Sequence, residues 1–544
     1  MMSERSDRRR WLGLLVVSLG VAMIIVDATI VNVAVPSIIK DLGATSSDAQ
    51  WIQESYTLVF AALLLVAGRT ADRAGRRRLF LIGVVVFVLG SIGCAQAPDP
   101  PLLIAFRLVQ GVGGALILPA SLSLLNATFT GRERGIAFAV WGSTIGGTAA
   151  LGPLLGGWLT TELSWRWAFG INIPLGALII AGALLLLPES REPRDRRGND
   201  WAGALISMVT LTGIVFGLIE GRNYGWFERT GPVDVAGFSW TARLSPVPVA
   251  LALAVAGVIA FVVVERRRNA AGRSVLLDLR LFAIPSFRNG NLVAGIVSLG
   301  EFGLLFSLPL WLQNVRGYTA FEAGLALLPL AAGSFLASGL AAPLTARRGA
   351  VFSVRLGILL ELAGVAGLGV VVAPGTPWWA FAPMLLVYGI GVGLATAQIT
   401  GVVLADVPVA MSGQASGTQS TTRQLGSALG IAVLGTVLFT TLAGHLGAAL
   451  TDRGIPAGER DAVITAVKDS AGAAIGGLAA DPGTAPLADD ARQAFSTATR
   501  WTAFTATGFL LIGLIASARL GRGRRDPDPP DGRAAEAAAA GGSG

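Results

Sequence analysis

Three acidic side chains and one arginine stand inside stretches of sequence that are otherwise apolar. They are Asp27, Arg107, Glu301 and Glu361. An ionisable group is costly in an apolar environment, so each of these requires a partner or a function. Burial disfavours the charged form of a carboxyl group, which can therefore take up and release a proton. The acidic side chains among them could exchange protons and attract a cation.

Asp27 is the first candidate for a carboxyl whose protonation is coupled to a second event, with Arg107 and Glu301 as the other proton-coupling residues. If H⁺ and a cationic ligand occupy one carboxyl in turn, linkage makes their movements opposite. Glu301 would be a second proton site or a recognition charge. The alternative is that polar groups of the fourth or fifth apolar segment hold Asp27 in a purely structural role.

Other polar residues in apolar segments carry weaker expectations. Glu54 lies near a segment end and is expected to be hydrated, and Arg423 is expected to extend towards the membrane surface. Glu361 is assigned to a substrate cavity, with a packing or lipid-edge role as the alternative. The other cavity residues are expected to be Asn32, Phe138, Trp141, Gln419 and Gln424.

The rare residues exclude several classes of site. The single histidine, His445, leaves no cluster for zinc and makes a Ser-His-Asp triad improbable. The single cysteine, Cys94, allows no internal disulfide. Neither lysine, Lys40 or Lys468, follows a GxxxxG run, so the chain has no Walker A motif. We therefore expect no enzyme, no metal, no cofactor and no nucleic-acid partner.

Composition shows which elements must position these residues. The 544 residues are 53% hydrophobic and only 14% charged, and the mean hydropathy is +0.64. Apolar stretches of about 20 residues predict membrane-spanning helices. There are fourteen, at approximately 11–35, 51–68, 79–97, 102–125, 135–159, 167–187, 201–220, 246–264, 290–312, 321–345, 351–373, 378–404, 414–444 and 499–520.

The distribution of Lys and Arg predicts an orientation. Most of them lie in every second connection, beginning with residues 1–10, which places both termini in the cytoplasm. The predicted order is a cytoplasmic N-terminus (1–10), a six-helix bundle (11–187), a linker with two inserted spans (188–288), a second six-helix bundle (289–520) and a disordered cytoplasmic tail (521–544). Within the second bundle, 445–498 is expected to be a long extracytoplasmic loop, with room for one short helix.

A weak internal repeat supports two similar bundles. Residues 109–113 (VQGVG) resemble 387–391 (VYGIG), and the segment from Arg134 to Gly152 has a counterpart from Ser412 to Gly430. The loop GRTADRAGRRR, which begins at Gly68, is weakly similar to a segment that ends at Gly349. Spans 1–6 thus match spans 9–14. Repeated bundles place a substrate site at their interface and allow access to alternate as one bundle tilts against the other.

Five segments resemble motifs of the major facilitator superfamily, in particular of its 14-span drug:H⁺ antiporters. One is the loop 68–78, which supplies the cytoplasmic gate residues Gly68, Asp72, Arg73, Gly75 and Arg76. The others are 27–36 (DATIVNVAVP) with 107–111 (RLVQG), the antiporter motif at Gly152, Pro153, Gly156 and Gly157, and 165–174 (WRWAFGINIP).

The motifs also have physical interpretations. Asp72 can cap a helix and pair with a nearby arginine, which would lock the cytoplasmic side shut. Pro153 is expected to bend its helix while the glycines pack closely, either sealing the cavity against protons or acting as a packing kink only.

The resemblance implies a monomeric, proton-coupled exporter of hydrophobic or cationic drugs or natural products in the bacterial cytoplasmic membrane, in contact with lipid. The alternatives are an exporter of one metabolite, lipid, siderophore, amino acid or self-made antibiotic, and a non-transporting membrane receptor.

Overall fold

The computed structural model describes residues 2–129, 131–189, 200–229, 233–235, 238–273, 275–408 and 411–520. The first half contains α1 (Met2–Leu42), α2 (Ser46–Ala74), α3 (Arg76–Gln96), α4 (Pro100–Thr128), α5 (Gly131–Glu162), α6 (Trp167–Gly170) and α7 (Asn172–Leu186). The second half contains α10 (Pro285–Asn314), α11 (Ala320–Arg348), α12 (Ala350–Val371), α13 (Trp378–Leu404), α14 (Ser412–Asp452) and α17 (Ala485–Ser517).

The two halves repeat the same packing, as the sequence predicts. α1 packs on α5 and α2 on α4 in the first half, and α10 packs on α14 and α11 on α13 in the second. The halves meet where α5 contacts α11 and where α2 contacts α14. Gly75 and Gly349 occupy the same turn of the repeat, with φ of 111° and 85°, a conformation that only glycine adopts without strain. The expected pair of six-helix bundles is confirmed.

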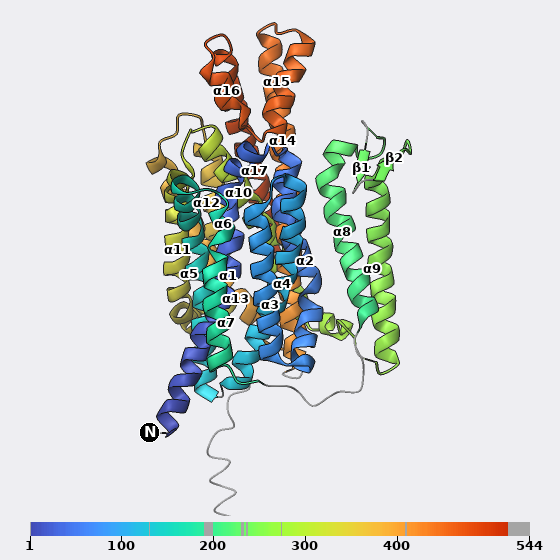
Figure 1. Ribbon diagram of the computed structural model, residues 1–544, viewed down its shortest axis with the longest axis vertical. Coiled ribbons are helices and arrows are strands. Elements are labelled where there is room, and N and C mark those ends of the chain that lie inside the picture. The colour runs from blue at the N-terminus through green and yellow to red at the C-terminus, as the bar shows by residue number, and fades with distance from the viewer. Residues whose placement is uncertain are drawn as a thin grey trace, which may run out of the picture.

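The inserted segment forms a separate helical pair. α8 (Trp201–Tyr224) and α9 (Pro246–Ala270) stand beside the rest of the molecule (Figure 1). A short antiparallel hairpin joins them, β1 (Val233–Val235) and β2 (Phe238–Trp240), with Asp234 opposite Ser239. The 3₁₀-helix η1 (Leu279–Ala283) leads from α9 to α10. The side chains of Ser47 and Trp51 on α2 donate hydrogen bonds to Glu220 Oε1 of α8, at 3.2 and 2.7 Å.

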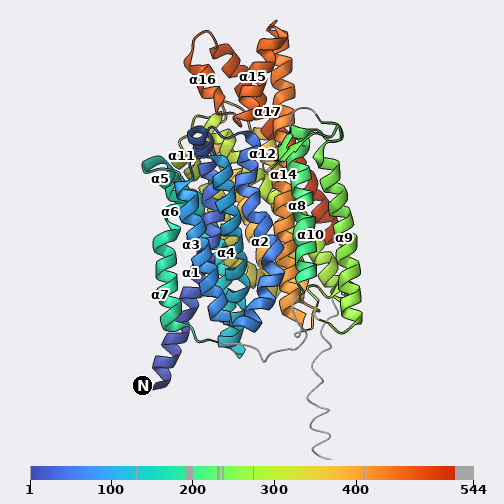
Figure 2. The same ribbon diagram turned by 45° about the vertical axis from the view of Figure 1, so that its right-hand side comes forward.

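The expected long loop at 445–498 is mostly helical. α14 continues to Asp452, α17 begins at Ala485, and α15 (Ala457–Asp469) and α16 (Ala474–Ala480) lie between them. α15 and α16 project from the end opposite the N-terminus (Figures 1 and 2). Asn314 at the end of α10 donates a hydrogen bond to the Ala471 carbonyl at 3.0 Å, which ties this projection to the bundle.

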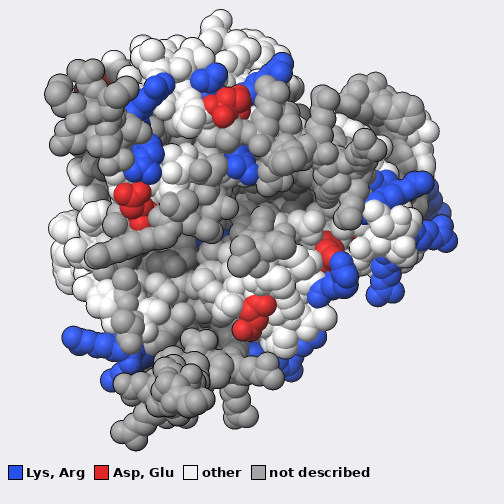
Figure 3. Space-filling model, turned by 90° about the horizontal axis from the view of Figure 1, so that it is seen from below, with Lys and Arg blue, Asp and Glu red and all other residues white. Residues whose placement is uncertain are grey.

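Eleven helices within the described residues are long and apolar enough to cross a membrane. Over that part of the chain α2, α5 and α8 are not among them, although each occupies an expected span. A multi-pass helical membrane protein is therefore confirmed, and the number fourteen stays a prediction. Seen from the end that carries the N-terminus, Lys and Arg side chains are spread around the rim (Figure 3), as the predicted orientation requires.

Candidate functional site

A buried ion pair joins α1 to α4. The Arg107 Nη1 atom lies 2.6 Å from Asp27 Oδ2, and the two side chains are 2% and 0% exposed. Both residues are placed by long helices, since α4 begins at Pro100, where Asp99 accepts a hydrogen bond from Leu102 N and caps the helix. Arg107 therefore sits two turns inside α4, within reach of the middle of α1. The sequence predicted these two residues, and the structure brings them together.

Every polar atom of the Asp27 carboxylate has a donor. Gln110 Nε2 donates to Asp27 Oδ1 at 3.0 Å, and Asn172 Nδ2 donates to the same oxygen at 2.7 Å. Gln110 follows Arg107 by three residues and therefore shares its face of α4. Asn172, the first residue of α7, brings a third helix to the same carboxylate. Donors from α4 and α7 therefore converge on this one carboxylate of α1.

The Arg107 guanidinium is equally well satisfied. Its Nε donates to the Ile52 carbonyl of α2 at 3.0 Å, and Nη1 also donates to Gln110 Oε1 at 2.9 Å. The ring of Tyr56, also on α2, lies 4.5 Å from the guanidinium carbon, a cation–π distance. Charge, hydrogen bonds and an aromatic face together compensate for the loss of water.

Two polar side chains of α3, Ser91 and Cys94, complete the network. Gln110 and Asn172 both donate to Ser91 Oγ, at 2.8 and 3.1 Å. The Cys94 thiol donates to Gln110 Oε1 at 3.3 Å, and Cys94 is fully buried. We call the set Asp27, Arg107, Gln110, Asn172, Ser91 and Cys94 the Asp27 network; it links α1, α3, α4 and α7.

The acids of the second half have a different environment. Glu301 on α10 is 4% exposed and Glu361 on α12 is 0% exposed. Among the described residues, neither oxygen of Glu361 has a hydrogen-bond partner. Glu301 Oε1 has none either. The two acids interact electrostatically with each other and with Arg423 of α14. Tyr388 of α13 donates to the Glu301 backbone carbonyl at 3.3 Å, not to a carboxylate.

Two expectations about charged residues are wrong, and the lipid-edge alternative for Glu361 is excluded. Glu361 does not lie at a lipid edge, because a Cβ on Gly391 of α13 would lie 2.7 Å from Glu361 Cγ. Arg423 is half-buried near Glu301 and Glu361 and does not extend to the membrane surface. Glu54 is fully buried, not hydrated, and neither of its oxygens has a partner among the described residues. The helix ends estimated from hydropathy were too short to reveal this burial.

The glycines of the antiporter motif bring α5 against both halves. A Cβ on Gly152 would lie 1.8 Å from Thr29 Oγ1, and one on Gly156 would lie 3.0 Å from the Ile30 carbonyl of α1. One on Gly157 would lie 2.5 Å from the Ala320 carbonyl of α11. The motif thus packs within three residues of Asp27 along α1. The Pro153 side chain, and with it the expected bend, lies outside the described residues.

The gate motif is described only in part. The side chains of Asp72 and Arg73 lie outside the description, although the backbone of Gly68, Asp72 and Arg73 belongs to α2. Gly75 is the N-cap of α3, and the cap expected from Asp72 stays a prediction. Arg76 opens α3. The proposed charge lock therefore stays a prediction.

The predicted cavity residues do not form one described cluster. Trp141 Nε1 donates to Ser121 Oγ at 3.2 Å within the first half, and Asn32 Nδ2 donates to the Ala28 carbonyl of its own helix at 3.4 Å. Gln419 Nε2 donates to Thr400 Oγ1 at 2.9 Å between α14 and α13, and Gln424 is half-buried on α14. The Phe138 side chain lies outside the described residues. The assignment of these residues to a substrate cavity stays a prediction.

The halves are closed against each other at the end away from the N-terminus. Gln313 Nε2 of α10 donates to the Val33 carbonyl of α1 at 3.0 Å, and the Phe321 backbone N–H of α11 donates to Thr161 Oγ1 of α5 at 3.0 Å. The close approach of Gly157 to Ala320 lies at the same end. These contacts hold that side of the interface shut.

Sequence reasoning missed five residues of the site: Asn172, Ser91, Cys94, Tyr56 and Gln110. Of these, Gln110 and Asn172 lie inside motifs that the sequence analysis singled out. Their polarity within apolar spans was the available signal. Ser91 and Tyr56 gave a weaker one, because serine and tyrosine are common in membrane helices. The described residues contain no group of three His, Cys, Asp or Glu side chains placed to hold a metal.

Comparison with known proteins gives consistent matches. The family model described as Major Facilitator Superfamily matches residues 17–431. The probable actinorhodin transporter of Streptomyces coelicolor is 34% identical over 455 residues, 82% of this chain and 75% of that protein. Multidrug resistance protein Stp of Mycobacterium tuberculosis is 35% identical over 454 residues, 82% of this chain and 80% of that protein.

A solved structure shares the fold. It is the crystal structure of a bacterial homologue of the human lysosomal transporter Spinster, in an inward-facing, unoccupied conformation. The TM-score is 0.61 at 17% sequence identity, covering 95% of this chain and 99% of the other.

Proposed function

The chain belongs to the major facilitator superfamily, and we propose that it is a proton-coupled antiporter that exports hydrophobic, cationic drugs or natural products across the bacterial cytoplasmic membrane by alternating access. The observation that carries the proposal is the fully buried Asp27–Arg107 ion pair inside a span of the first half. Intramembrane charges of this kind mark ion and substrate pathways.

The ion pair supplies a way to couple a proton to a movement of helices. While Asp27 is charged, it holds α4 and α7 against α1 through Arg107 and Asn172. Protonation removes the negative charge and leaves Arg107 buried without compensation, which is strongly unfavourable. The network must then rearrange. A proton on Asp27 thus favours a different arrangement of the first half from the one described here.

The second half offers charge for a cationic substrate. Glu301 and Glu361 carry oxygens with no partner among the described residues, so a bound cation would compensate a cost that the protein does not compensate itself. The proton gradient supplies the energy. Each proton that moves inward down 100 mV yields about 2.3 kcal/mol, roughly a fiftyfold gradient of an uncharged substrate. One-for-one exchange with a monovalent cation moves no net charge, so there the pH gradient alone drives export.

Charge also supports the proposed orientation. The end with the N-terminus carries arginines around its rim (Figure 3), and we place it in the cytoplasm by the positive-inside rule. The contacts at Gln313 and Phe321 then close the extracytoplasmic side. The state described is accordingly one in which substrate would enter from the cytoplasm. We propose that the protein works as a monomer, because each chain carries both halves of the site.

A second candidate is an exporter dedicated to one natural product. The observation that favours it is the name of the Streptomyces coelicolor relative, a probable actinorhodin transporter. The Mycobacterium tuberculosis relative, a multidrug resistance protein, favours broad specificity. Competition separates the two: several unrelated lipophilic cations should each inhibit transport of a fluorescent cation by a broad exporter, whereas a dedicated exporter would ignore most of them.

The test is proton-driven transport in proteoliposomes. Wild type should accumulate a fluorescent lipophilic cation when a pH gradient is imposed, and Asp27→Asn should lose at least about 90% of this rate because it can no longer exchange the proton. The matched control is Asp41→Asn, which removes an acid from the same helix that also pairs with an arginine at 2.6 Å, but at the surface. This control should transport normally.

A double variant separates coupling from structure. Asp27→Asn leaves Arg107 uncompensated, so it lowers stability as well. Asp27→Asn with Arg107→Gln removes both charges and should fold like wild type, as size-exclusion chromatography and thermal unfolding would show, yet remain inactive. Recovery of pH-driven transport in the double variant would mean that Asp27 is only structural, and the coupling proposal would fail.

A further inference from the structure

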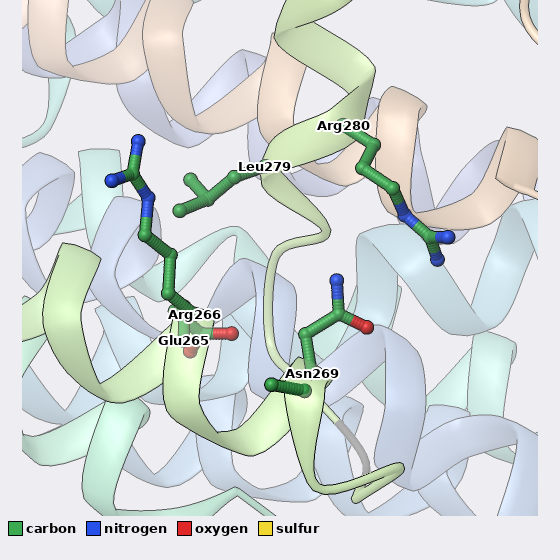
Figure 4. Close-up of a pocket in the computed structure, with 6 residues that line it drawn as sticks. Glu265, Arg266, Asn269, Leu279 and Arg280 are labelled. Carbon is green, nitrogen blue, oxygen red and sulfur yellow. The ribbon is translucent and has the colours of Figure 1, made fainter.

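A hollow at the basic end of the inserted pair is separate from the site described above. It lies between the last turn of α9 and η1 and has a volume of about 490 Å³. Arg266, Asn269, Leu279 and Arg280 line it together with Glu265 and Ala270. Figure 4 shows the arginines on opposite sides, with Leu279 and Asn269 between them.

Asp278 beside the hollow is fully engaged, whereas Glu265 is bound through only one of its two oxygens. Asp278 is bound by Arg280 Nη2 at 2.6 Å and by Asn269 Nδ2 at 3.3 Å. Glu265 Oε2 accepts the Leu277 backbone N–H at 3.3 Å, and its Oε1 faces α8, 2.5 Å from where a Cβ on Gly203 would lie. Arg266 is exposed and forms no ion pair with any described residue. The hollow therefore has a positive charge available for an anion.

The face of α9 that leads to Arg266 is apolar and uncovered. Ile259, Val263, Arg266 and Ala270 follow one another at intervals of four, three and four residues, which places them on one face of the helix. Ile259 is 60% exposed and Val263 40% exposed. Only 11% of the apolar stretch of α9 is buried in the protein, so in a membrane this face meets lipid chains.

We propose that this hollow binds the phosphate-bearing headgroup of an anionic phospholipid. The guanidinium of Arg266 would hold the phosphate by charge-assisted hydrogen bonds, with Arg280 and the Asn269 amide at the far side. One acyl chain would lie along Val263 and Ile259. Basic pockets at the headgroup level of membrane proteins bind anionic lipids in this way. The bound lipid would fasten the end of α9 to η1 and so to the start of α10.

Binding can be measured without transport. The purified protein is placed in phosphatidylcholine nanodiscs that contain a small mole fraction of labelled phosphatidylglycerol, and retention of the label is measured by native mass spectrometry. Arg266→Gln should reduce retention about tenfold, as loss of a hydrogen bond to a charged group predicts. The matched control is Arg267→Gln, which removes an adjacent exposed arginine that does not line the hollow and should change retention less than about twofold.

Two further measurements distinguish the outcomes. Arg280→Gln should cause a smaller loss than Arg266→Gln, because its guanidinium is already engaged by Asp278. Equal losses of lipid retention in Arg266→Gln and Arg267→Gln would mean that diffuse surface charge holds the lipid, and would overturn the proposal. Unchanged retention in both variants would overturn it as well. If inorganic phosphate at millimolar concentration displaces the label from wild type, the occupant is a soluble phosphate compound, and the lipid assignment is wrong. Thermal unfolding of each variant shows that it is folded.

Discussion

The two repeated halves treat a buried acid in opposite ways. In the first half, Asp27 receives three hydrogen bonds, and its countercharge Arg107 is satisfied by two helices. In the second half, Glu361 is equally buried but has no hydrogen-bond partner among the described residues. The repeat explains part of the difference, because the position of Gln110 in α4 is taken by Tyr388 in α13. Tyr388 donates to the backbone carbonyl of Glu301 and not to a carboxylate.

The difference indicates a division of labour built on one fold. A saturated ion pair fixes helices to one another and, in the proposed mechanism, rearranges when Asp27 takes up a proton. An acid without a hydrogen-bond partner is costly to the protein until something else compensates it. We therefore expect mutations to have opposite signs in the two halves. Charge removal should be harmful at the Asp27 network and neutral or favourable at the second-half acids.

The largest effect should come from breaking the ion pair. Arg107→Ala leaves the Asp27 carboxylate buried without its countercharge, which should lower the free energy of unfolding by about 3–5 kcal/mol. Thermal unfolding in detergent measures this. A double-mutant cycle with Asp27→Asn should show strong coupling, with the double variant more stable than Arg107→Ala alone. Independent, additive effects would show that the pair contributes little.

A much smaller effect is expected in the second half. Glu361→Gln keeps the size of the side chain and removes a charge that has no described hydrogen-bond partner, so stability should rise or fall by less than about 1 kcal/mol. The same melting assay, run beside Asp27→Asn, gives the comparison. A loss as large as that of Asp27→Asn would reveal a hidden partner for Glu361 and remove the contrast between the halves.

The smallest effect is expected for an ion pair at the surface, which tests whether burial or the pairing itself makes the Asp27–Arg107 pair important. Asp278 pairs with Arg280, whose side chain is 75% exposed, and this guanidinium holds the pKa of Asp278 below its usual value. A lowered folded-state pKa means that the pair contributes stability above the unfolded-state pKa of about 3.9 and that this contribution is lost as pH falls below it. Wild type should therefore melt slightly above Asp278→Asn at pH 7, and the gap should close in more acidic buffer. A gap that widens there would contradict the sign.

Most of the fold could be predicted from hydropathy and charge. Long apolar segments and alternating arginine-rich connections predicted the helices, and the glycine echoes between 109–113 and 387–391 predicted the repeat. Helix ends could not be predicted, because capping and packing extend helices beyond their apolar part. α14 therefore continues to Asp452, and 445–498 is a helical projection where a loop was expected.

The site was predictable in its charges but not in its neutral partners. An acid or arginine in a membrane span is a strong signal because its cost is high. Ser91 and Asn172 cost little in such a span, so their role appears only when α3 and α7 are placed beside α1. Glu54 shows the reverse case, since its distance from the middle of the span suggested hydration that the surrounding helices prevent.

The only thiol of the protein is that of Cys94. It lies inside the Asp27 network, donates a hydrogen bond to Gln110 and is out of contact with solvent. A water-soluble alkylating reagent therefore reports on one place alone. Its rate of modification follows how often the first half opens around the ion pair, and it needs no engineered cysteine or removal of native ones. The alkylation rate of the native Cys94 thus measures the opening of the Asp27 network, the movement on which the proposed coupling depends.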